Sequence, residues 1–227
     1  MSEYILSQVP FLIKSETSYV EDDFFVSDAN VIAKKFIDQW PNWGDSPLSK
    51  ILFLVGEEGS GKTHLVKIWQ KKSNALALSI GDILNHGFNN IEVSCFIFEN
   101  IHRYGQYSED ILHLVNFCLN NNKFLFITSL TNVDSINIKL QDLTSRLKSA
   151  TNISLLGPDQ EVTSQILMKY FSDRQIKIDH KIIKYLSVRV PRSYPAIKKV
   201  IEDIDYISLT NKKPITIPFL QKYLGYS

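Results

Sequence analysis

The chain has 227 residues, of which 44% are hydrophobic, so it can bury the core of one α/β domain with a small appendage. Charged residues make up 22% and nearly balance, which gives a net charge of +1 and a pI of about 7.7. This balance argues against a module that binds duplex DNA directly, since such modules usually have a basic face and a high pI, although a local patch can be hidden in the average.

The composition also bears on the compartment. Cys95 and Cys118 show no metal-ligand spacing with a histidine and are expected to be buried, reduced thiols. Residues 1–10 lack the basic region followed by an apolar stretch that marks a secretory signal. No apolar run approaches the roughly 20 residues of a membrane span. We therefore expect a soluble, cytoplasmic protein without membrane contact.

The first segment in chain order, residues 1–22, is predicted to be an N-terminal tail with one short apolar cluster, Val9 to Ile13. Apolar residues then fall at helical spacing from Asn30 to Trp40. Turn-forming residues interrupt the chain between Pro41 and Pro47. The sheet-forming part of the chain is therefore expected to begin after Pro47.

Five apolar segments follow as predicted strands. Ile51–Val55 is too short for a buried helix and fits a strand that is covered on both faces. Helical patterns, such as Leu65–Trp69 and Ile111–Leu119, alternate with the later strands. This alternation predicts parallel βαβ units and a doubly wound five-stranded sheet of the α/β class. The other strands are predicted over residues 75–80, 93–98, 123–128 and 153–155.

The pattern changes after Gly157-Pro158, where the remaining segments are helical and show no strand signal. We therefore expect an α/β domain over residues 23–157 and a small C-terminal all-helical lid domain over residues 158–227. The lid helices are predicted over residues 160–171, 181–189, 195–210 and 217–224.

A glycine-rich turn joins the first strand to the next helix. Its sequence, Gly56-Glu57-Glu58-Gly59-Ser60-Gly61-Lys62-Thr63, matches the P-loop pattern G-x-x-x-x-G-K-[ST]. Glycines let the backbone wrap around phosphates, and the N-terminus of the helix faces the anion. Lys62 is predicted to reach the β and γ phosphates and Thr63 to ligate Mg²⁺, so the expected cofactors are ATP or ADP and Mg²⁺. The residues expected to hold them are Gly56, Gly59, Ser60, Gly61, Lys62, Thr63 and the adjacent His64.

The third strand ends in Glu99-Asn100, where a P-loop NTPase carries its metal-holding carboxylate. Glu99 is predicted to hold the Mg²⁺, usually through water; the alternative is a strand-end carboxylate in solvent. An active hydrolase adds a second carboxylate next to it to polarise the attacking water. An amide cannot act as a general base, so Asn100 predicts slow intrinsic hydrolysis.

Three further features leave two interpretations each. Thr128 and Ser129 end the fourth strand, where a hydroxyl can touch the γ phosphate or be an ordinary polar residue. Arg146, just before the fifth strand, can act as a finger on a neighbour's ATP or form a surface salt bridge. The tail residues can dock in a partner's groove or fold back on their own domain. These tail residues are Gln8, Val9, Pro10, Phe11 and Leu12.

Together these residues resemble the Hda family, which consists of DnaA-like AAA+ proteins without the DNA-binding domain. The tail residues 8–12 are similar to the family's clamp-binding motif, and the stretch Asp142-Leu143-Thr144-Ser145-Arg146-Leu147 resembles its D-L-x-S-R-L finger motif. Phe25 and Val26 look like the segment that packs near the adenine. The family's sensor arginine falls nearest Pro195, so either Arg192 substitutes for it or the sensor is missing.

The resemblance implies a regulator of replication initiation. Such a protein binds nucleotide, docks on the DNA polymerase III sliding clamp (β subunit) and promotes hydrolysis of ATP bound to DnaA, with Arg146 acting in trans. The resemblance also leaves open a nucleotide-dependent homodimer, and it implies no direct sequence-specific DNA binding. Two other hypotheses stay open: an active AAA+ ATPase such as a helicase loader, and a nucleotide-dependent scaffold without a catalytic role.

Overall fold

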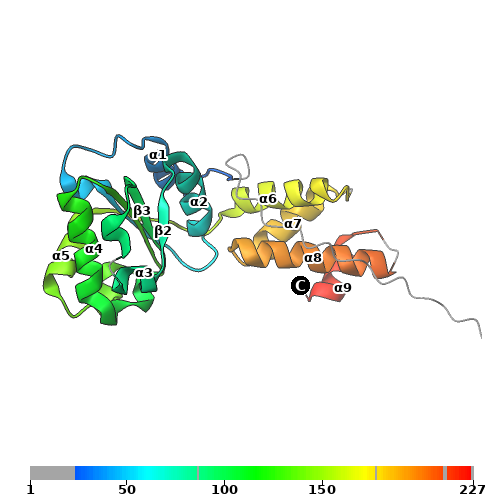
Figure 1. Ribbon diagram of the computed structural model, residues 1–227. Coiled ribbons are helices and arrows are strands. Elements are labelled where there is room, and N and C mark those ends of the chain that lie inside the picture. The colour runs from blue at the N-terminus through cyan, green and yellow to red at the C-terminus, as the bar shows by residue number, and fades with distance from the viewer. Residues whose placement is uncertain (1–23, 86, 177, 212–213, 226–227) are drawn as a thin grey trace, which may run out of the picture. The chain divides into compact units, whose positions relative to one another are not determined.

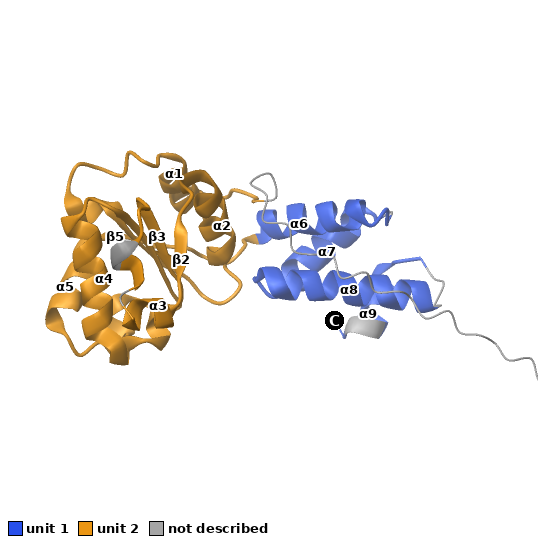
Figure 2. Cartoon of the chain, viewed as in Figure 1, with its two compact units in different colours: residues 1–18, 160–227 blue, residues 19–159 orange. Residues whose placement is uncertain are grey.

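The computed structural model describes residues 24–85, 87–176, 178–211 and 214–225, which form two compact units (Figures 1 and 2). One unit ends at Asp159 and the other begins at Gln160. The first unit contains the whole sheet, and the described part of the second is helical. The tail residues Gln8–Leu12 lie outside the described residues.

The five strands of the first unit form one parallel sheet in the order β2-β3-β4-β1-β5. The central strand β1 pairs with β4 on one side, Ile51 opposite Leu125, and with β5 on the other, Leu52 opposite Thr151. This arrangement confirms the predicted five-stranded parallel α/β sheet. The strands are β1 Ile51–Val55, β2 Leu76–Leu78, β3 Cys95–Phe98, β4 Phe124–Ser129 and β5 Thr151–Ser154.

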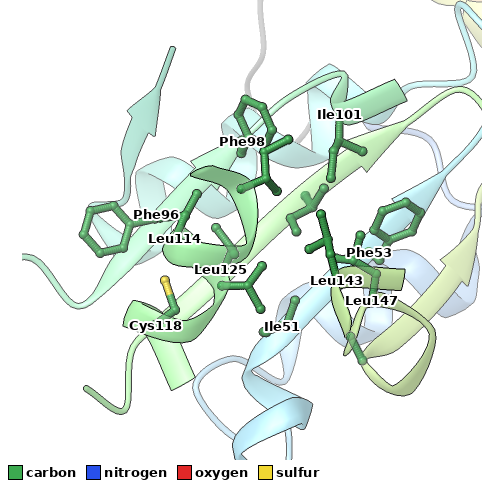
Figure 3. Packing of buried hydrophobic residues seen from close by; sticks show 14 of the residues in the cluster. Ile51, Phe53, Phe96, Phe98, Ile101, Leu114, Cys118, Leu125, Leu143 and Leu147 are labelled. Atoms are coloured by element: carbon green, nitrogen blue, oxygen red, sulfur yellow. The ribbon is translucent and has the colours of Figure 1, made fainter. Parts of the chain in front are cut away.

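Helices cover both faces of the sheet (Figure 1). Side chains alternate along β1, so Ile51 and Phe53 enter one hydrophobic cluster while Leu52 and Leu54 enter the other. The first cluster includes side chains of α3, α4 and α5 and is shown in Figure 3; the second includes side chains of α1 and α2. The helices are α1 Val31–Asp38, α2 Lys62–Ser73, α3 Ile80–Leu84, α4 Ser108–Asn120 and α5 Gln141–Ser149.

One predicted strand is shorter than expected for a local reason. Residues 75–80 are predicted as a strand, but β2 ends at Leu78 because Ser79 caps the short helix α3. The Ser79 hydroxyl accepts a hydrogen bond from the Asp82 backbone N–H, and the Asp82 carboxylate accepts one from the Ser79 backbone N–H at 2.7 Å. This capping box favours the helix over an extended strand at these residues.

The second unit consists of α6 Gln160–Asp173, α7 His180–Arg189, α8 Tyr194–Asn211 and α9 Ile217–Leu224. α6 packs against α7 and α8, with Leu167, Leu186 and Ile201 fully buried. The Asp179 carboxylate caps α7 by accepting a hydrogen bond from the Lys181 backbone N–H at 2.8 Å. In the part of the chain that the structure describes, no helix is long and apolar enough to cross a membrane.

Candidate functional site

The P-loop begins directly after the central strand β1. The Gly56 backbone N–H donates to the Ser129 carbonyl at 3.2 Å, which fixes the loop to the end of β4. A Cβ atom at Gly56 would lie 2.6 Å from both the Leu155 carbonyl oxygen and the Ser60 hydroxyl. Only glycine fits where the loop passes this close to the chain beyond β5.

The rest of the loop turns sharply into α2. Gly59 and Gly61 have φ values of 74° and 101°, a region that other residues rarely adopt. Gly61 is followed at once by Lys62, the first residue of α2. The first N–H groups of a helix have no carbonyl partner within the helix, and the helix dipole favours an anion there. The fold therefore aims an anion-binding helix end at the loop.

Lys62 is held inside this loop. Its side chain is buried, and its ammonium group donates to the carbonyl oxygens of Gly56 at 2.6 Å and Glu57 at 2.9 Å. Burial lowers the pKa of Lys62 below its usual 10.5, and the carboxylates of Glu58 and Glu99 oppose that shift. A phosphate at the loop would supply the negative charge that this partly desolvated cation lacks.

Two hydroxyls and one carboxylate complete the loop. The Ser60 hydroxyl is buried without a hydrogen-bond partner, as expected of a group that meets its partner on a ligand. The Thr63 hydroxyl donates to the Glu99 carboxylate, at the end of β3, at 3.4 Å. Thr63 and Glu99, the two residues predicted to ligate Mg²⁺, thus lie next to each other. Among the described residues no group of three His, Cys, Asp or Glu gathers as a metal site.

Asn100 and Thr128 meet beside Glu99. The Asn100 backbone N–H donates to the Thr128 hydroxyl at 3.0 Å, and Asn100 has a φ of 60°. The Ser129 hydroxyl donates to the Thr131 carbonyl at 2.6 Å. Both hydroxyls therefore have structural hydrogen bonds, and Thr128 is the one that contacts the segment after Glu99. Asparagine tolerates this left-handed backbone conformation better than most residues do.

His102 lies three residues after Glu99 and makes a structural hydrogen bond. Its Nδ1 accepts a hydrogen bond from the Leu130 backbone N–H at 3.2 Å, which ties the segment after β3 to the end of β4. Burial lowers the pKa of His102, and the positive charges of Arg103 and Lys62 lower it further. No local sequence pattern reveals this hydrogen bond, because His102 and Leu130 are 28 positions apart.

The segment predicted to lie near the adenine is folded onto the P-loop helix. Phe24 is buried, and its ring makes an edge contact with the ring of His64 at 5.2 Å between centroids. The Asn30 amide donates to the Phe25 carbonyl at 2.8 Å, and its oxygen accepts from the Ser27 N–H at 3.0 Å. Phe25 is half-buried and Val26 is exposed. The structure thus brings His64 to this segment through Phe24.

Arg146 lies on the outer face of α5. Its Nε is 3.0 Å from the Asp142 carboxylate, one turn earlier on the same helix, and the two side chains are 35% and 55% exposed. Within the described residues, no hydrogen bond or ion pair joins Arg146 to the P-loop. It borders an open hollow of about 410 Å³ that is also lined by Leu48 and Leu119. Arg192, in the second unit, is exposed between α7 and α8.

Residues 159–224 match the family model described as "Hda, lid domain". The chromosomal replication initiator protein DnaA of Buchnera aphidicola is 24% identical over 246 residues, covering 96% of this chain and 53% of DnaA. The chain is thus similar to DnaA over most of its length and to the Hda lid domain over its C-terminal part. It spans about half the length of the curated DnaA relatives it matches, 53% and 45% for two Buchnera proteins.

Solved structures show the same AAA+ fold. Domain III of DnaA from Thermotoga maritima superposes with a TM-score of 0.72 at 16% identity, covering 92% of this chain and 97% of that domain. DnaA from Aquifex aeolicus, solved with AMPPCP bound, gives a TM-score of 0.70 at 17% identity, covering 87% of this chain and 69% of that one. The AAA+ fold predicted from the sequence, with a helical lid after the sheet, is confirmed.

Proposed function

We propose that this protein is a nucleotide-binding regulator of replication initiation that acts on DnaA. It binds ATP or ADP with Mg²⁺ at the P-loop, and its Arg146 promotes hydrolysis of ATP held by DnaA. The observation that carries this proposal is the combination of a fully built P-loop, with Lys62 buried at its centre, and an amide at Asn100. The first supports tight nucleotide binding and the second supports weak hydrolysis in cis.

The weak hydrolysis follows from the chemistry of the side chain after Glu99. Hydrolysis of the γ phosphate is faster when a carboxylate accepts the proton that the attacking water loses. Asn100 has no basic atom, and its backbone N–H is occupied by Thr128. The nucleotide in this chain therefore serves to hold a conformation, and the ATP that is hydrolysed belongs to the partner.

Three groups would have separate roles: Arg146 on the partner's nucleotide, Arg192 on the nucleotide of this chain, and Gln8–Leu12 in the assembly. Arg146 points outward from α5 with only its Nε bonded to Asp142, so its terminal nitrogens can reach a phosphate in trans. Arg192 would read the nucleotide from the lid domain, taken as residues 158–227. Residues Gln8–Leu12 would dock on the sliding clamp and bring the protein to DNA in the cytoplasm. Support for this assignment comes from the match of residues 159–224 to the Hda lid domain.

The test follows labelled ATP already bound to the cognate DnaA. Its hydrolysis is timed with clamp-loaded DNA, with and without this protein, and with the variants Arg146→Ala and Lys148→Ala. Lys148 is the matched control, because it is an exposed cation on the same helix with its own ion pair to Asp134. We expect stimulation by the wild type and by Lys148→Ala, and its loss in Arg146→Ala. Stimulation that survives in Arg146→Ala would remove the finger from the proposal.

The same experiment separates the other two hypotheses. An active ATPase, such as a helicase loader, would hydrolyse ATP rapidly without DnaA and lose this activity in Lys62→Ala. A scaffold would bind nucleotide but leave DnaA-bound ATP unchanged in every variant. Deleting residues 1–13 tests the clamp separately, because binding to the isolated clamp should then be lost while nucleotide binding is kept.

A further inference from the structure

The near-neutral net charge of the chain hides an uneven distribution between the two units. Residues 160–227 contain twelve lysines and arginines and six aspartates and glutamates, a net charge of +6. Residues 24–159 contain twelve and thirteen, a net charge of −1. The helical unit is therefore strongly basic for its size, and the average over the chain conceals it.

Part of this charge has acidic neighbours within the unit, but among the described residues Lys181 and Lys184 on α7 have none in an ion pair. Lys198 and Lys199 lie one turn before Glu202 and Asp203 on α8, and Arg174 pairs with Asp205 at 3.7 Å. α7, residues His180–Arg189, has no acidic residue, and the Asp179 carboxylate before it is bonded to the backbone N–H of Lys181. Within the described chain no carboxylate pairs with the ammonium group of Lys181 or Lys184.

The cations of α7 lie on its solvent side. Lys181 and Lys184 are three residues apart, which puts them on one face, and both are exposed. Arg189, in the last turn, is exposed as well, and its guanidinium lies 4.0 Å from the centre of the Tyr185 ring. The opposite side of the helix is buried through Ile182, Ile183 and Leu186. We name Lys181, Lys184 and Arg189 the α7 basic face.

We propose that the α7 basic face binds the phosphate backbone of duplex DNA without reading its sequence. A duplex carries one negative charge per roughly 1.7 Å of its axis, while α7 spans about 15 Å, so several phosphates lie within reach of one helix. The Tyr185 ring is covered by Arg189, so it offers no platform for stacking an unpaired base. The α7 basic face thus recognises the regularly spaced phosphate charges of a duplex backbone.

A second lysine-rich surface provides the matched control. Lys35 on α1 and Lys67 and Lys71 on α2 are also exposed, but they belong to the unit with a net charge of −1. Lys67 already donates to the Gln70 amide oxygen at 3.0 Å, and Asp38 lies on the same surface, where its backbone carbonyl accepts from Lys72. Removing these three charges changes the net charge as much as removing the α7 basic face.

The experiment measures the anisotropy of a labelled random-sequence duplex of about 20 base pairs with the full chain, from 50 to 200 mM salt. Three phosphate contacts predict a slope of about −2.7 in log K against log salt, or roughly 40-fold weaker binding over that range. In the triple variant Lys181→Gln, Lys184→Gln, Arg189→Gln the slope should fall towards zero. The variant Lys35→Gln, Lys67→Gln, Lys71→Gln should keep it. Circular dichroism and nucleotide binding confirm that both variants are folded.

Three outcomes would overturn the proposal. The first is a wild-type slope near zero, and the second is an equal loss of binding in the control variant. The third is displacement of the duplex, at equal charge concentration, by a peptide of residues 1–23, which carries one lysine and five acidic residues. That result would assign the α7 basic face to an acidic peptide. None of these outcomes depends on DnaA, so they leave the proposed function to its own test.

Discussion

The P-loop and the surface around Arg146 belong to the same unit, but they hold their cations in different ways. Lys62 is buried, bonds two loop carbonyls and follows a loop with two positive-φ glycines. Arg146 is a third exposed and has one bond to a neighbour on its own helix. The loop binds its ligand with atoms that the fold has already placed. The arginine needs a partner molecule to complete its site.

This difference indicates where the free energy of binding comes from. A group that is already placed loses little conformational entropy when the ligand arrives, whereas an exposed arginine loses rotamer freedom on docking. We therefore expect the P-loop to bind nucleotide in the isolated protein, and the Arg146 surface to act only within a complex. The predictions below test that contrast, from the largest expected effect to the smallest.

The largest effect is expected for Lys62→Ala. Hydrogen bonds to a charged group contribute about 1.5–3 kcal/mol, so nucleotide affinity should fall roughly 10- to 150-fold. Burial lowers the pKa of Lys62, so its ammonium group loses its proton below pH 10.5 as the pH rises. The affinity of the wild type for nucleotide should therefore decline with rising pH before 10.5 is reached. Calorimetric titration with ATP measures both. Lys67→Ala, an exposed lysine on the same helix, is the control, and an equal loss there would show that the P-loop does not dominate binding.

The next effect is on stability, for Gly56→Ala. Its Cβ would sit 2.6 Å from a backbone oxygen, which must move, and overpacking of this kind costs about 1–3 kcal/mol. Urea unfolding followed by tryptophan fluorescence measures it, since Trp43 and Trp69 stack in the core of this unit. Gly81→Ala is the control, because its Cβ would meet only the Ser79 hydroxyl at 3.5 Å within α3. Equal stability of the two variants would contradict a tightly built loop.

The sequence predicted those parts of the fold and site that depend on neighbouring residues. The P-loop is a contiguous motif, and Ile51–Val55 is a continuous apolar run, so both could be located by pattern alone. The parallel pairing of the strands follows from their alternation with helices, but that alternation does not decide the order β2-β3-β4-β1-β5. The end of β2 was predicted two residues too late. Its position depends on the helix cap at Ser79, which hydrophobicity does not indicate.

The rest of the site depends on contacts between distant residues that no local pattern encodes. Asn100 meets Thr128 across 28 positions, and His102 meets Leu130 across another 28. Phe24 contacts His64, which is 40 positions away, and the spacing of aromatic residues does not reveal this contact. The charge of the helical unit is visible in the sequence, because the predicted boundary after residue 157 lies two residues from the observed one after Asp159.

A smaller effect is expected for Asn100→Asp. The new carboxylate would stand next to Glu99 and Thr128, and aspartate accepts a φ of 60° as readily as asparagine. General-base catalysis contributes about 100-fold or more when optimised, so an unoptimised base should raise intrinsic hydrolysis about tenfold. Single-turnover release of phosphate measures the change. The gain should disappear when Lys62→Ala is added, and an unchanged rate in Asn100→Asp would show that this position does not face the attacking water.

The smallest effect is expected for Asp142→Ala, which removes the partner of Arg146. An exposed pair one turn apart on a helix contributes about 0.3–0.5 kcal/mol, although Asp142 also favours the N-terminal turn of α5 through the helix dipole. A double-mutant cycle with Arg146→Ala separates the two terms, because only the pair appears in the coupling free energy. Urea unfolding at low and high salt measures it, and the coupling should vanish at high salt. A salt-resistant coupling above about 1 kcal/mol would mean that Arg146 is fixed before any partner arrives, since exposed pairs rarely exceed that value, and the contrast with Lys62 would then fail.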